Sequence, residues 1–402
     1  MEILLIKENF MRIANYIFSF FIFMASCQSP KDQEKFKWNA GISSPKYYSA
    51  APFVEYFYQG KSVAGASTNI GVGQGWGITM GGYTGGDIFK PVPDSVFVKW
   101  SCGVDDILYE GGYKLPRKKM IQLFRKGAVN PNNAKIDDYT LLVGGTAPGG
   151  NVTIWMKAGQ VITEIVKFKA HNKGIWMKGN IEYHKLMKEI KNSKEYINSE
   201  TSIYLYLHGV PYSVWEKGEK KYDYDIGFSS EDGLVKPKIV TINSTDGSWY
   251  QSWTNKASIN SIDIFKWENY NYLENNNLKR QEKLPVQIDL KWKITNQDKM
   301  MHGILVMPQN LEELVSKPYI NSISNKTEYY NRIIITSYKG GGKGILWLTG
   351  KNKKIKLMEF IMLDSEDKNI KSYYSLPKGF VFPKWEGREP LKTPEIEYWQ
   401  EK

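Results

Sequence analysis

The chain has 402 residues, enough for two or three domains that each bury a core. Hydrophobic residues make up 42% and charged residues 24%, which excludes a disordered chain and predicts a globular one. The net charge of +12 would suit an anionic partner, but the lysines are scattered and no arginine-rich arm or nucleic-acid-binding motif occurs. We therefore expect no nucleic-acid partner.

The first 27 residues have the pattern of an export signal. Arg12 precedes an apolar run at 13–23 that is short for a membrane span, and Met24-Ala-Ser-Cys27 follows it. Bacterial lipoprotein signals have this order, and the cysteine thiol then takes a diacylglycerol and becomes the mature N-terminus. Met11 is an alternative start, and an uncleaved anchor helix or a plain secretory signal is the alternative to lipidation at Cys27.

Lipidation at Cys27 would hold the protein in the bacterial cell envelope by a membrane lipid anchor. Residues 28–35 are polar and would form a tether, and Gln28 in place of Asp favours sorting to the outer membrane. The folded part would lie in the periplasm or at the cell surface. Cys102 is the only other cysteine, so we expect a buried strand thiol and no internal disulfide.

Two stretches of the chain resemble each other at a nearly constant separation, with a slightly shorter separation at their N-terminal ends. This pattern predicts two tandem homologous units with a small insertion in the second. The matched segments are 36–44 with 222–230, 96–100 with 288–292, and Gly149-Gly150 with Gly341-Gly342.

The repeat divides the chain into six parts. They are a signal peptide at 1–27, a tether at 28–35, a first β-rich unit at 36–176, a helical connector at 177–221, a second β-rich unit at 222–370 and an extended C-terminal tail at 371–402.

Hydrophobic patterning predicts short strands around one helix in each unit, an α+β, β-rich fold with a mainly antiparallel sheet or sandwich. The connector carries apolar residues at helical spacing over 180–190, and we expect this helix to pack on one unit. Expected strands are 36–42, 53–58, 95–100, 107–113, 139–143, 152–156 and 161–168 in the first unit, and 286–294, 300–307, 332–337, 344–348 and 355–362 in the second; expected helices are 116–126 and 309–315.

The glycine-rich segment TLLVGGTAPGGNVTIW at 140–155 resembles a phosphate-binding loop at first sight. A strand follows it where such a loop needs a helix, and no Lys-Ser or Lys-Thr pair accompanies it. The second copy, Gly340-Gly-Gly-Lys343, has the same context. We therefore expect both to be hairpin turns.

Residues of the types that bind metals or take part in catalysis do not form any known motif. The four histidines, His171, His184, His208 and His302, are far apart, so we expect no metal and no cofactor. No nucleophile motif occurs, so we assign no catalytic residue. The adjacent pairs Asp105-Asp106 and Asp137-Asp138 follow or precede strands and are expected in solvated turns.

A glycine-dense span at 71–86 is the one candidate ligand-binding loop. It carries two aromatic residues, Trp76 and Tyr83, and the second unit does not repeat it.

Several of these segments together resemble a known family. They are Phe36–Tyr48, Gly75-Trp-Gly77, Pro93-Asp-Ser95 and Gly144–Gly150. In them the chain resembles the bacterial lipoprotein family called domain of unknown function 2931. The resemblance implies an envelope lipoprotein and carries over no activity, and Ser49 stands where the family pattern leads us to expect proline.

The absence of a site motif and the richness in aromatic residues favour a non-catalytic binding or interaction module with a protein or glycan partner. It could be an immunity-type lipoprotein or a surface accessory protein. The alternative is an enzyme that acts on envelope glycan or lipid, which carboxylates converging in a deep pocket would favour.

Overall fold

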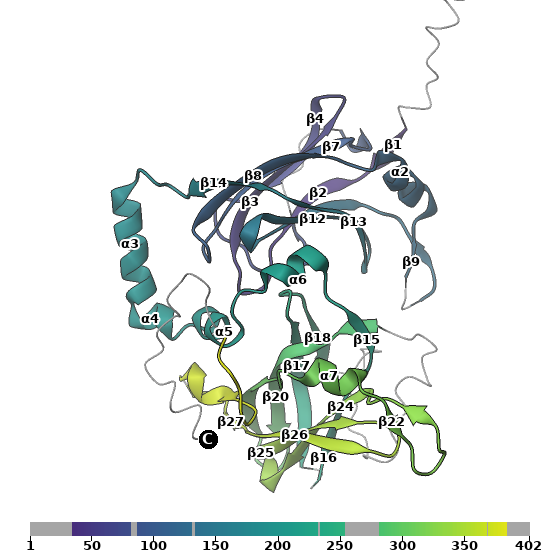
Figure 1. Cartoon of the computed structure of the whole chain (residues 1–402), viewed down its shortest axis with the longest axis vertical. Coiled ribbons are helices and arrows are strands. Elements are labelled where there is room, and N and C mark those ends of the chain that lie inside the picture. The colour runs from purple at the N-terminus through teal and green to yellow at the C-terminus, as the bar shows by residue number, and fades with distance from the viewer. Residues whose placement is uncertain are drawn as a thin grey trace, which may run out of the picture.

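The computed structural model describes residues 34–81, 87–130, 133–231, 234–253, 281–367 and 369–383. Figure 1 shows two β-rich halves, one above the other, with a group of helices beside and between them. Several antiparallel sheets and few short helices confirm the expected β-rich α+β class. Cys27 and the rest of the expected signal lie outside the described residues.

The first half contains two five-stranded sheets. Their orders are β13-β12-β11-β2-β5 and β14-β8-β7-β3-β4, and all neighbours are antiparallel except β2, which runs parallel to β11. The strands are β1 (Lys35–Lys37), β2 (Asn39–Ser43), β3 (Ala50–Tyr58), β4 (Lys61–Ser67), β5 (Met80–Gly81), β6 (Phe89–Pro91), β7 (Ser95–Cys102), β8 (Ile107–Lys114), β9 (Ala128–Val129), β10 (Ile136–Asp137), β11 (Leu141–Ala147), β12 (Asn151–Ala158), β13 (Val161–Lys169) and β14 (His171–Ile175).

The core of the first half lies between these sheets. On β7 every second side chain points inward, so Val96, Val98 and Trp100 are buried as the alternating sequence predicts. Helix α2 (Arg117–Lys126) follows Pro116 and ends at Gly127, whose φ of 67° suits glycine, and it buries Met120 and Phe124.

The second half contains a four-stranded sheet, β16-β24-β25-β26, and a larger one, β18-β17-β20-β21-β27. Strand β28 pairs with β21, and helix α7 (Leu311–Ser316) follows β21. The strands are β15 (Lys221–Asp223), β16 (Asp225–Ser230), β17 (Val235–Ser244), β18 (Trp249–Trp253), β19 (Gln281–Lys283), β20 (Pro285–Ile294), β21 (Lys299–Val306), β22 (Tyr319–Ile320), β23 (Thr327–Glu328), β24 (Arg332–Tyr338), β25 (Lys343–Thr349), β26 (Lys354–Ile361), β27 (Leu363–Asp364) and β28 (Tyr374–Ser375).

The two halves share a strand order. The pair β2–β11 is parallel in the first half, and β16–β24 is parallel in the second. Trp100 on β7 lies opposite Pro52, and Trp292 on β20 lies opposite Pro237; both indoles are buried. Their common origin by duplication, and the exact unit boundaries, stay predictions.

Four helices form the connector: α3 (Ile181–Asn192), α4 (Lys194–Ile197), α5 (Glu200–His208) and α6 (Tyr212–Lys217). Helix α3, which we expected to pack on one unit, has no fully buried residue; Tyr183 and Met187 are half-buried, and Lys191 donates a hydrogen bond to Asp106 of the first half at 2.7 Å. Helix α5 is the one that packs. It is apolar or aromatic nearly all round and buries every residue from Ser202 to Leu207 between the halves.

The segment expected as an extended tail packs in its first part. A 3₁₀ turn at Ile370–Tyr373 leads into β28, and Tyr373 and Tyr374 are buried beside α5 and β21. Two large aromatic side chains remove enough apolar surface from water to hold this segment. None of the described helices has the length and apolar character that crossing a bilayer requires.

Candidate functional site

The two halves and the connector meet at the turn between β17 and β18. The carbonyl oxygen of Gly247 accepts hydrogen bonds from the backbone amides of Lys46 and Trp76, both at 3.0 Å. The indole Nε1 of Trp215, on α6, donates to the carbonyl oxygen of Asp246 at 2.9 Å. The turn therefore joins all three parts of the chain.

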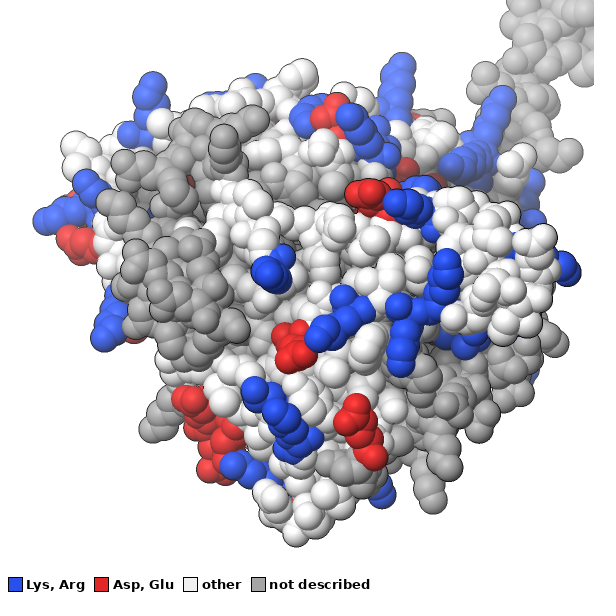
Figure 2. Space-filling model, turned by 60° about the horizontal axis from the view of Figure 1, so that its bottom comes forward, with Lys and Arg blue, Asp and Glu red and all other residues white. Residues whose placement is uncertain are grey.

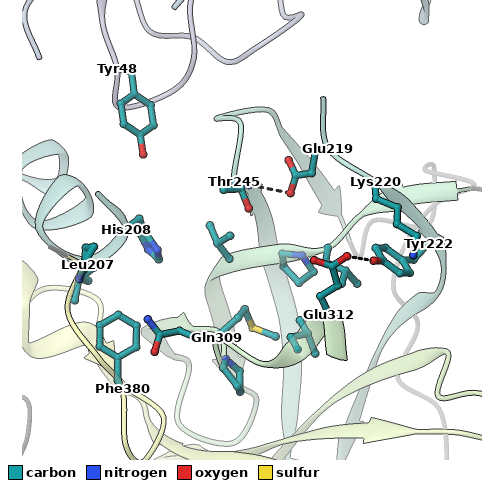
Figure 3. A pocket seen from close by; sticks show the side chains of 17 residues that line it. Tyr48, Leu207, His208, Glu219, Lys220, Tyr222, Thr245, Gln309, Glu312 and Phe380 are labelled. Atoms are coloured by element: carbon teal, nitrogen blue, oxygen red, sulfur yellow. Dashed lines mark hydrogen bonds between the residues drawn. The ribbon is translucent and has the colours of Figure 1, made fainter. Parts of the chain in front are cut away.

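A pocket of about 280 Å³ lies beside this turn (Figure 3). Its apolar lining comes mainly from the start of β20 and from the segment that leads into α7, with Phe380 at one side. Tyr48 reaches it from the first half. The apolar residues are Leu207, Leu284, Pro285, Val286, Met307, Pro308, Leu311, Phe380 and Pro383, and the polar ones are Tyr48, His208, Glu219, Lys220, Tyr222, Thr245, Gln309 and Glu312.

Glu219 lies in the loop between α6 and β15 and is largely buried. Its carboxylate accepts hydrogen bonds from the backbone amides of Thr245 at 3.4 Å and Asp246 at 3.2 Å. Burial and, next, the charge of Asp246 raise the pKa of Glu219 to about 7, against the opposing charge of Lys283. This carboxyl group therefore exchanges its proton near neutral pH.

Asp246 beneath it is held by a network of its own. Its carboxylate forms an ion pair with the ammonium group of Lys283 and accepts hydrogen bonds from the amide and hydroxyl of Ser248 at 2.9 and 2.6 Å. The Lys283 ammonium also donates to the hydroxyl of Ser248 at 3.1 Å. These contacts fix the shape of the turn on which Glu219 rests.

His208, at the end of α5, enters the pocket as a neutral group. Burial lowers the pKa of His208 to about 4, although its hydrogen bond of 3.1 Å with the amide oxygen of Gln287 opposes this shift. The hydroxyl of Tyr48 donates to the carbonyl oxygen of Gly209 at 2.7 Å. Both groups thus support the wall of the pocket at neutral pH.

Glu312, on α7, is the second carboxylate of the pocket. It accepts a hydrogen bond from the hydroxyl of Tyr222, on β15 (Figure 3). Glu219 and Glu312 come from separate elements, and no motif in the sequence marks either one. Only the packing of β15, α6 and α7 brings them to one pocket.

Trp76, one of the two expected ligand-binding aromatics, lies in a packed contact. Its side chain is 8% exposed and meets the ring of Trp155 edge-on, with 4.8 Å between ring centroids. The ring is not presented to solvent and does not line the pocket. Tyr83, the other expected residue, lies outside the described residues.

The glycine-rich segment forms a hairpin turn, as expected. Residues Pro148–Gly150 make a 3₁₀ turn between the antiparallel strands β11 and β12. The amide of Gly149 donates to the carboxylate of Asp105 at 2.9 Å, so a side chain of the protein itself occupies this donor. The expectation of a solvated Asp105 is wrong: it is 5% exposed, because it also accepts a hydrogen bond from Tyr109 at 2.7 Å.

Cys102 is buried at the end of β7, as the strand pattern predicts. Burial and then the charge of Asp105 raise the pKa of the Cys102 thiol to about 12. Over the described residues, no group of three His, Cys, Asp or Glu side chains is arranged to hold a metal ion.

Basic side chains outnumber acidic ones on the face drawn in Figure 2, and both kinds are scattered over it. Most described ion pairs are solvent-exposed, such as Lys356 with Glu359 at 2.8 Å and Lys299 with Asp364 at 3.2 Å.

Residues 25–213 match a family described as a protein of unknown function, DUF2931. The match covers the first half and the connector as far as the start of α6. No curated protein matches the chain, and no solved structure matches it. The carboxylates Glu219 and Glu312 lie C-terminal to the matched stretch.

Proposed function

We propose that the protein is a lipid-anchored binding protein of the bacterial envelope, and that the pocket between its halves takes a small amphipathic ligand. The pocket carries this proposal, because a concave apolar surface with a few polar groups at its edge is the usual form of a ligand site. Its volume of about 280 Å³ suits a small molecule or the end of a longer one.

The polar groups indicate which ligand chemistry fits. The carboxylates of Glu219 and Glu312 have more acceptor lone pairs than their hydrogen bonds within the protein use, whereas the amide oxygen of Gln309 accepts a hydrogen bond from the amide of Val381 at 3.1 Å. A ligand with hydroxyl or amino groups beside an apolar portion would satisfy both parts of the pocket. Sugars and the amino-bearing headgroups of envelope lipids belong to this class.

Binding is favoured over catalysis because the two carboxylates already have structural partners. Glu219 holds the amides of the β17–β18 turn, and Glu312 holds the hydroxyl of Tyr222. A catalytic pair would need at least one of these groups directed at the substrate.

Filling the pocket tests its role. Val286→Trp places a large ring at the apolar lining, and Ile88→Trp adds the same ring at a position 68% exposed in the first half. Each protein is purified from native envelope and its bound small molecules are identified by native mass spectrometry. We expect a ligand with the parent and with Ile88→Trp and none with Val286→Trp; equal ligand content in all three would contradict the proposal.

The anchor is tested separately at Cys27. We expect Cys27→Ser to move the protein from the membrane fraction to the soluble fraction, and to remove a diacylglycerol mass from the mature N-terminal peptide. Unchanged membrane association would show that lipid at Cys27 is not the anchor.

A second candidate function is hydrolysis of an envelope glycan or lipid. It is favoured by two carboxylates in one pocket, one of which has a pKa of about 7 and can hold the proton that a leaving group needs. Envelope glycans and lipids are incubated with the parent, Glu219→Gln and Glu312→Gln, and products are followed by mass spectrometry. Turnover by the parent that both substitutions abolish would establish the enzyme, and no turnover by the parent would exclude it for these substrates.

A further inference from the structure

The last described stretch of the chain forms one wall of the pocket. Phe380 and Pro383 line the pocket, and Figure 3 shows the ring of Phe380 at its edge, beside Gln309. The outer side of this stretch faces solvent, since Val381 is 66% exposed. We call residues 377–383 the strap. The strap therefore separates one side of the pocket from bulk water.

Few hydrogen bonds join the strap to the rest of the protein. The side-chain amide of Gln309 donates to the carbonyl oxygen of Val381 at 2.7 Å and accepts from the backbone amide of Val381 at 3.1 Å. Within the described part of the chain, no other hydrogen bond links the strap to another element. The bond of 3.1 Å from the amide of Phe380 to the carbonyl oxygen of Pro377 stays inside the strap. One side chain therefore holds the backbone of the strap in place.

The aromatic side chains of the strap pack on α5 without full burial. The ring centroid of Phe382 lies 5.1 Å from that of Tyr206 and 5.2 Å from that of Phe380, and both phenylalanines are half-buried. The segment before the strap is anchored more firmly, because Tyr374 is buried and β28 pairs with β21. The strap can thus leave α5 while β28 stays in place.

The turn at the start of the strap has room to move. Gly379 has a φ of 76°, and an added Cβ there would meet nothing within 4 Å. Both Lys378 and Gly379 are exposed. At the other end, a Cβ on Gly209 would lie 3.1 Å from Cβ of Pro383, so the strap rests on the end of α5. A glycine in open space adopts other backbone angles at little cost, which suits a hinge.

We propose that the strap opens to admit the ligand of the pocket and closes behind it, and that Gln309 is the latch of the closed form. This inference rests on the ligand role proposed for the pocket. Segments that cover a binding site open in microseconds to milliseconds, and their opening can limit the rates of ligand entry and release. Gln309 is a positioning residue here, since its amide acts on the backbone of Val381.

The first test needs no ligand. Hydrogen exchange of peptides that cover residues 377–383 is measured by mass spectrometry on the chain from Gln28 onward, which keeps every described residue. We expect exchange to be about tenfold faster in Gln309→Leu, which keeps the bulk of the side chain and removes both hydrogen bonds. Equal exchange in Gln309→Leu and the parent would overturn the latch.

Gln251→Leu is the matched control for this substitution. The side-chain amide of Gln251, on β18, donates to the hydroxyl of Thr241 at 3.2 Å, and β18 lies away from the strap (Figure 1). We expect this variant to exchange at the strap like the parent. Gln309 is solvent-exposed, so its substitution should spare the fold, and circular dichroism checks this for each variant.

The second test measures ligand entry and release by stopped flow with N-phenyl-1-naphthylamine, an apolar dye whose fluorescence rises when it leaves water. We expect the parent to bind the dye and Val286→Trp not to bind it. In Gln309→Leu we expect the association and dissociation rate constants to rise together by about tenfold, because both steps pass through the open strap. A change in the dissociation rate alone would show that residue 309 only lines the pocket, and would overturn the gate.

The outcomes separate this inference from the proposed function. No dye binding by the parent, or equal binding by Val286→Trp, would contradict the ligand role of the pocket, and the gate with it. Dye binding with the same two rate constants in the parent and Gln309→Leu would overturn the gate alone. We also expect bound dye to slow exchange at residues 377–383 in the parent, since Phe380 and Pro383 line the pocket. Unchanged exchange on dye binding would likewise contradict closure of the strap.

Discussion

Glu219 is the residue through which pH acts on the pocket. Its pKa is about 7 in the folded chain, above the ordinary value of 4.5 expected after unfolding. The folded state therefore holds this proton more tightly than the unfolded state. The stabilisation by the proton is complete below pH 4.5 and is lost as the pH rises toward 7.

Substitution of this carboxyl group should reverse that loss. At acid pH we expect Glu219→Gln to differ little from the parent, since both side chains are then neutral. As the pH rises from 4.5 to 8, we expect the free energy of unfolding of Glu219→Gln to increase relative to that of the parent by up to about 3 kcal/mol. Urea unfolding at several pH values measures this, with the exposed Glu366→Gln as the control. A difference that stays constant with pH would contradict the role of burial.

Cys102 gives a second test at a single residue. Because burial raises the pKa of its thiol to about 12, we expect almost no reaction with a thiol reagent in the native protein at pH 8. The chain from Gln28 contains this one cysteine. Absorbance with Ellman's reagent should show one reactive thiol in guanidinium chloride and almost none in buffer; rapid reaction in buffer would place Cys102 at the surface.

The sequence predicts one of these residues and misses the other for a physical reason. The burial of Cys102 follows from alternation along a single strand, which is a local pattern. The pKa of Glu219 is raised first by burial and then by the charge of Asp246, which comes from another part of the chain. The spacing of residues along the chain does not predict a contact between residues that are so far apart in sequence.

The two glycine turns show how an element can be recognised while its alignment is off by one residue. Gly149 and Gly340 have nearly equal backbone angles, φ 73° and ψ 19° against φ 65° and ψ 21°. The sequence alignment instead paired Gly149 with Gly341. Gly342, in a right-handed conformation, is the additional residue of the second turn. Glycine runs look alike in sequence, so only the backbone shows which member makes the turn.

Alanine substitution distinguishes the surroundings of the two turns. At Gly340 an added Cβ meets nothing within 4 Å, so we expect Gly340→Ala to cost about 1 to 2 kcal/mol from the left-handed backbone alone. At Gly149 the Cβ would lie 2.6 Å from Cδ1 of Tyr212, and we expect a larger loss. Denaturant unfolding compares the two variants, and equal losses would contradict the contact with Tyr212.

Local pattern predicted about half of the strands and the helices α2, α3 and α7, and it missed others such as β4 and β17. Strand β4 was missed because its sequence, KSVAGAS, has little apolar bulk, and it pairs along β3. Helix α3 was predicted, yet none of its residues is fully buried. Periodicity shows that a face is apolar and cannot show what lies against it.

At the scale of the whole molecule, the β17–β18 turn links the stability of the two halves. Gly247 has a φ of 76°, and a Cβ there would lie 2.5 Å from Cβ of Pro45 in the first half. Its carbonyl oxygen also holds two amides of the first half. We infer that the halves support each other through this contact.

Calorimetry of Gly247→Ala tests that link. We expect the parent to unfold in one transition and Gly247→Ala to unfold in two, because the added methyl group pushes the turn away from Pro45. Gly60→Ala is the matched control, since Gly60 has a φ of 74° and open space around its Cβ position. A single transition in Gly247→Ala, shifted no more than in the control, would show that the halves are coupled elsewhere.

The repeated segments in the sequence predict that the two halves share a strand order. They do not predict which residues join the halves. Lys46 donates to the side-chain oxygen of Asn243 at 3.1 Å, and Tyr48 donates to the backbone of Gly209. These partners lie far apart in the chain and belong to no motif. A repeat predicts which elements each half contains, but it does not predict which residues of one half contact the other.

The parallel pairing of β2 with β11 affects the order in which the protein can form. Leu141 on β11 pairs with Asn39 on β2, so β2 cannot pair until a strand about 100 residues later in the chain has been synthesised. The same holds for Asp225 on β16 and Arg332 on β24. Contacts of such high sequence separation form slowly. A nascent chain can therefore travel some distance from the ribosome before either half closes, and such an open chain suits the export that we propose.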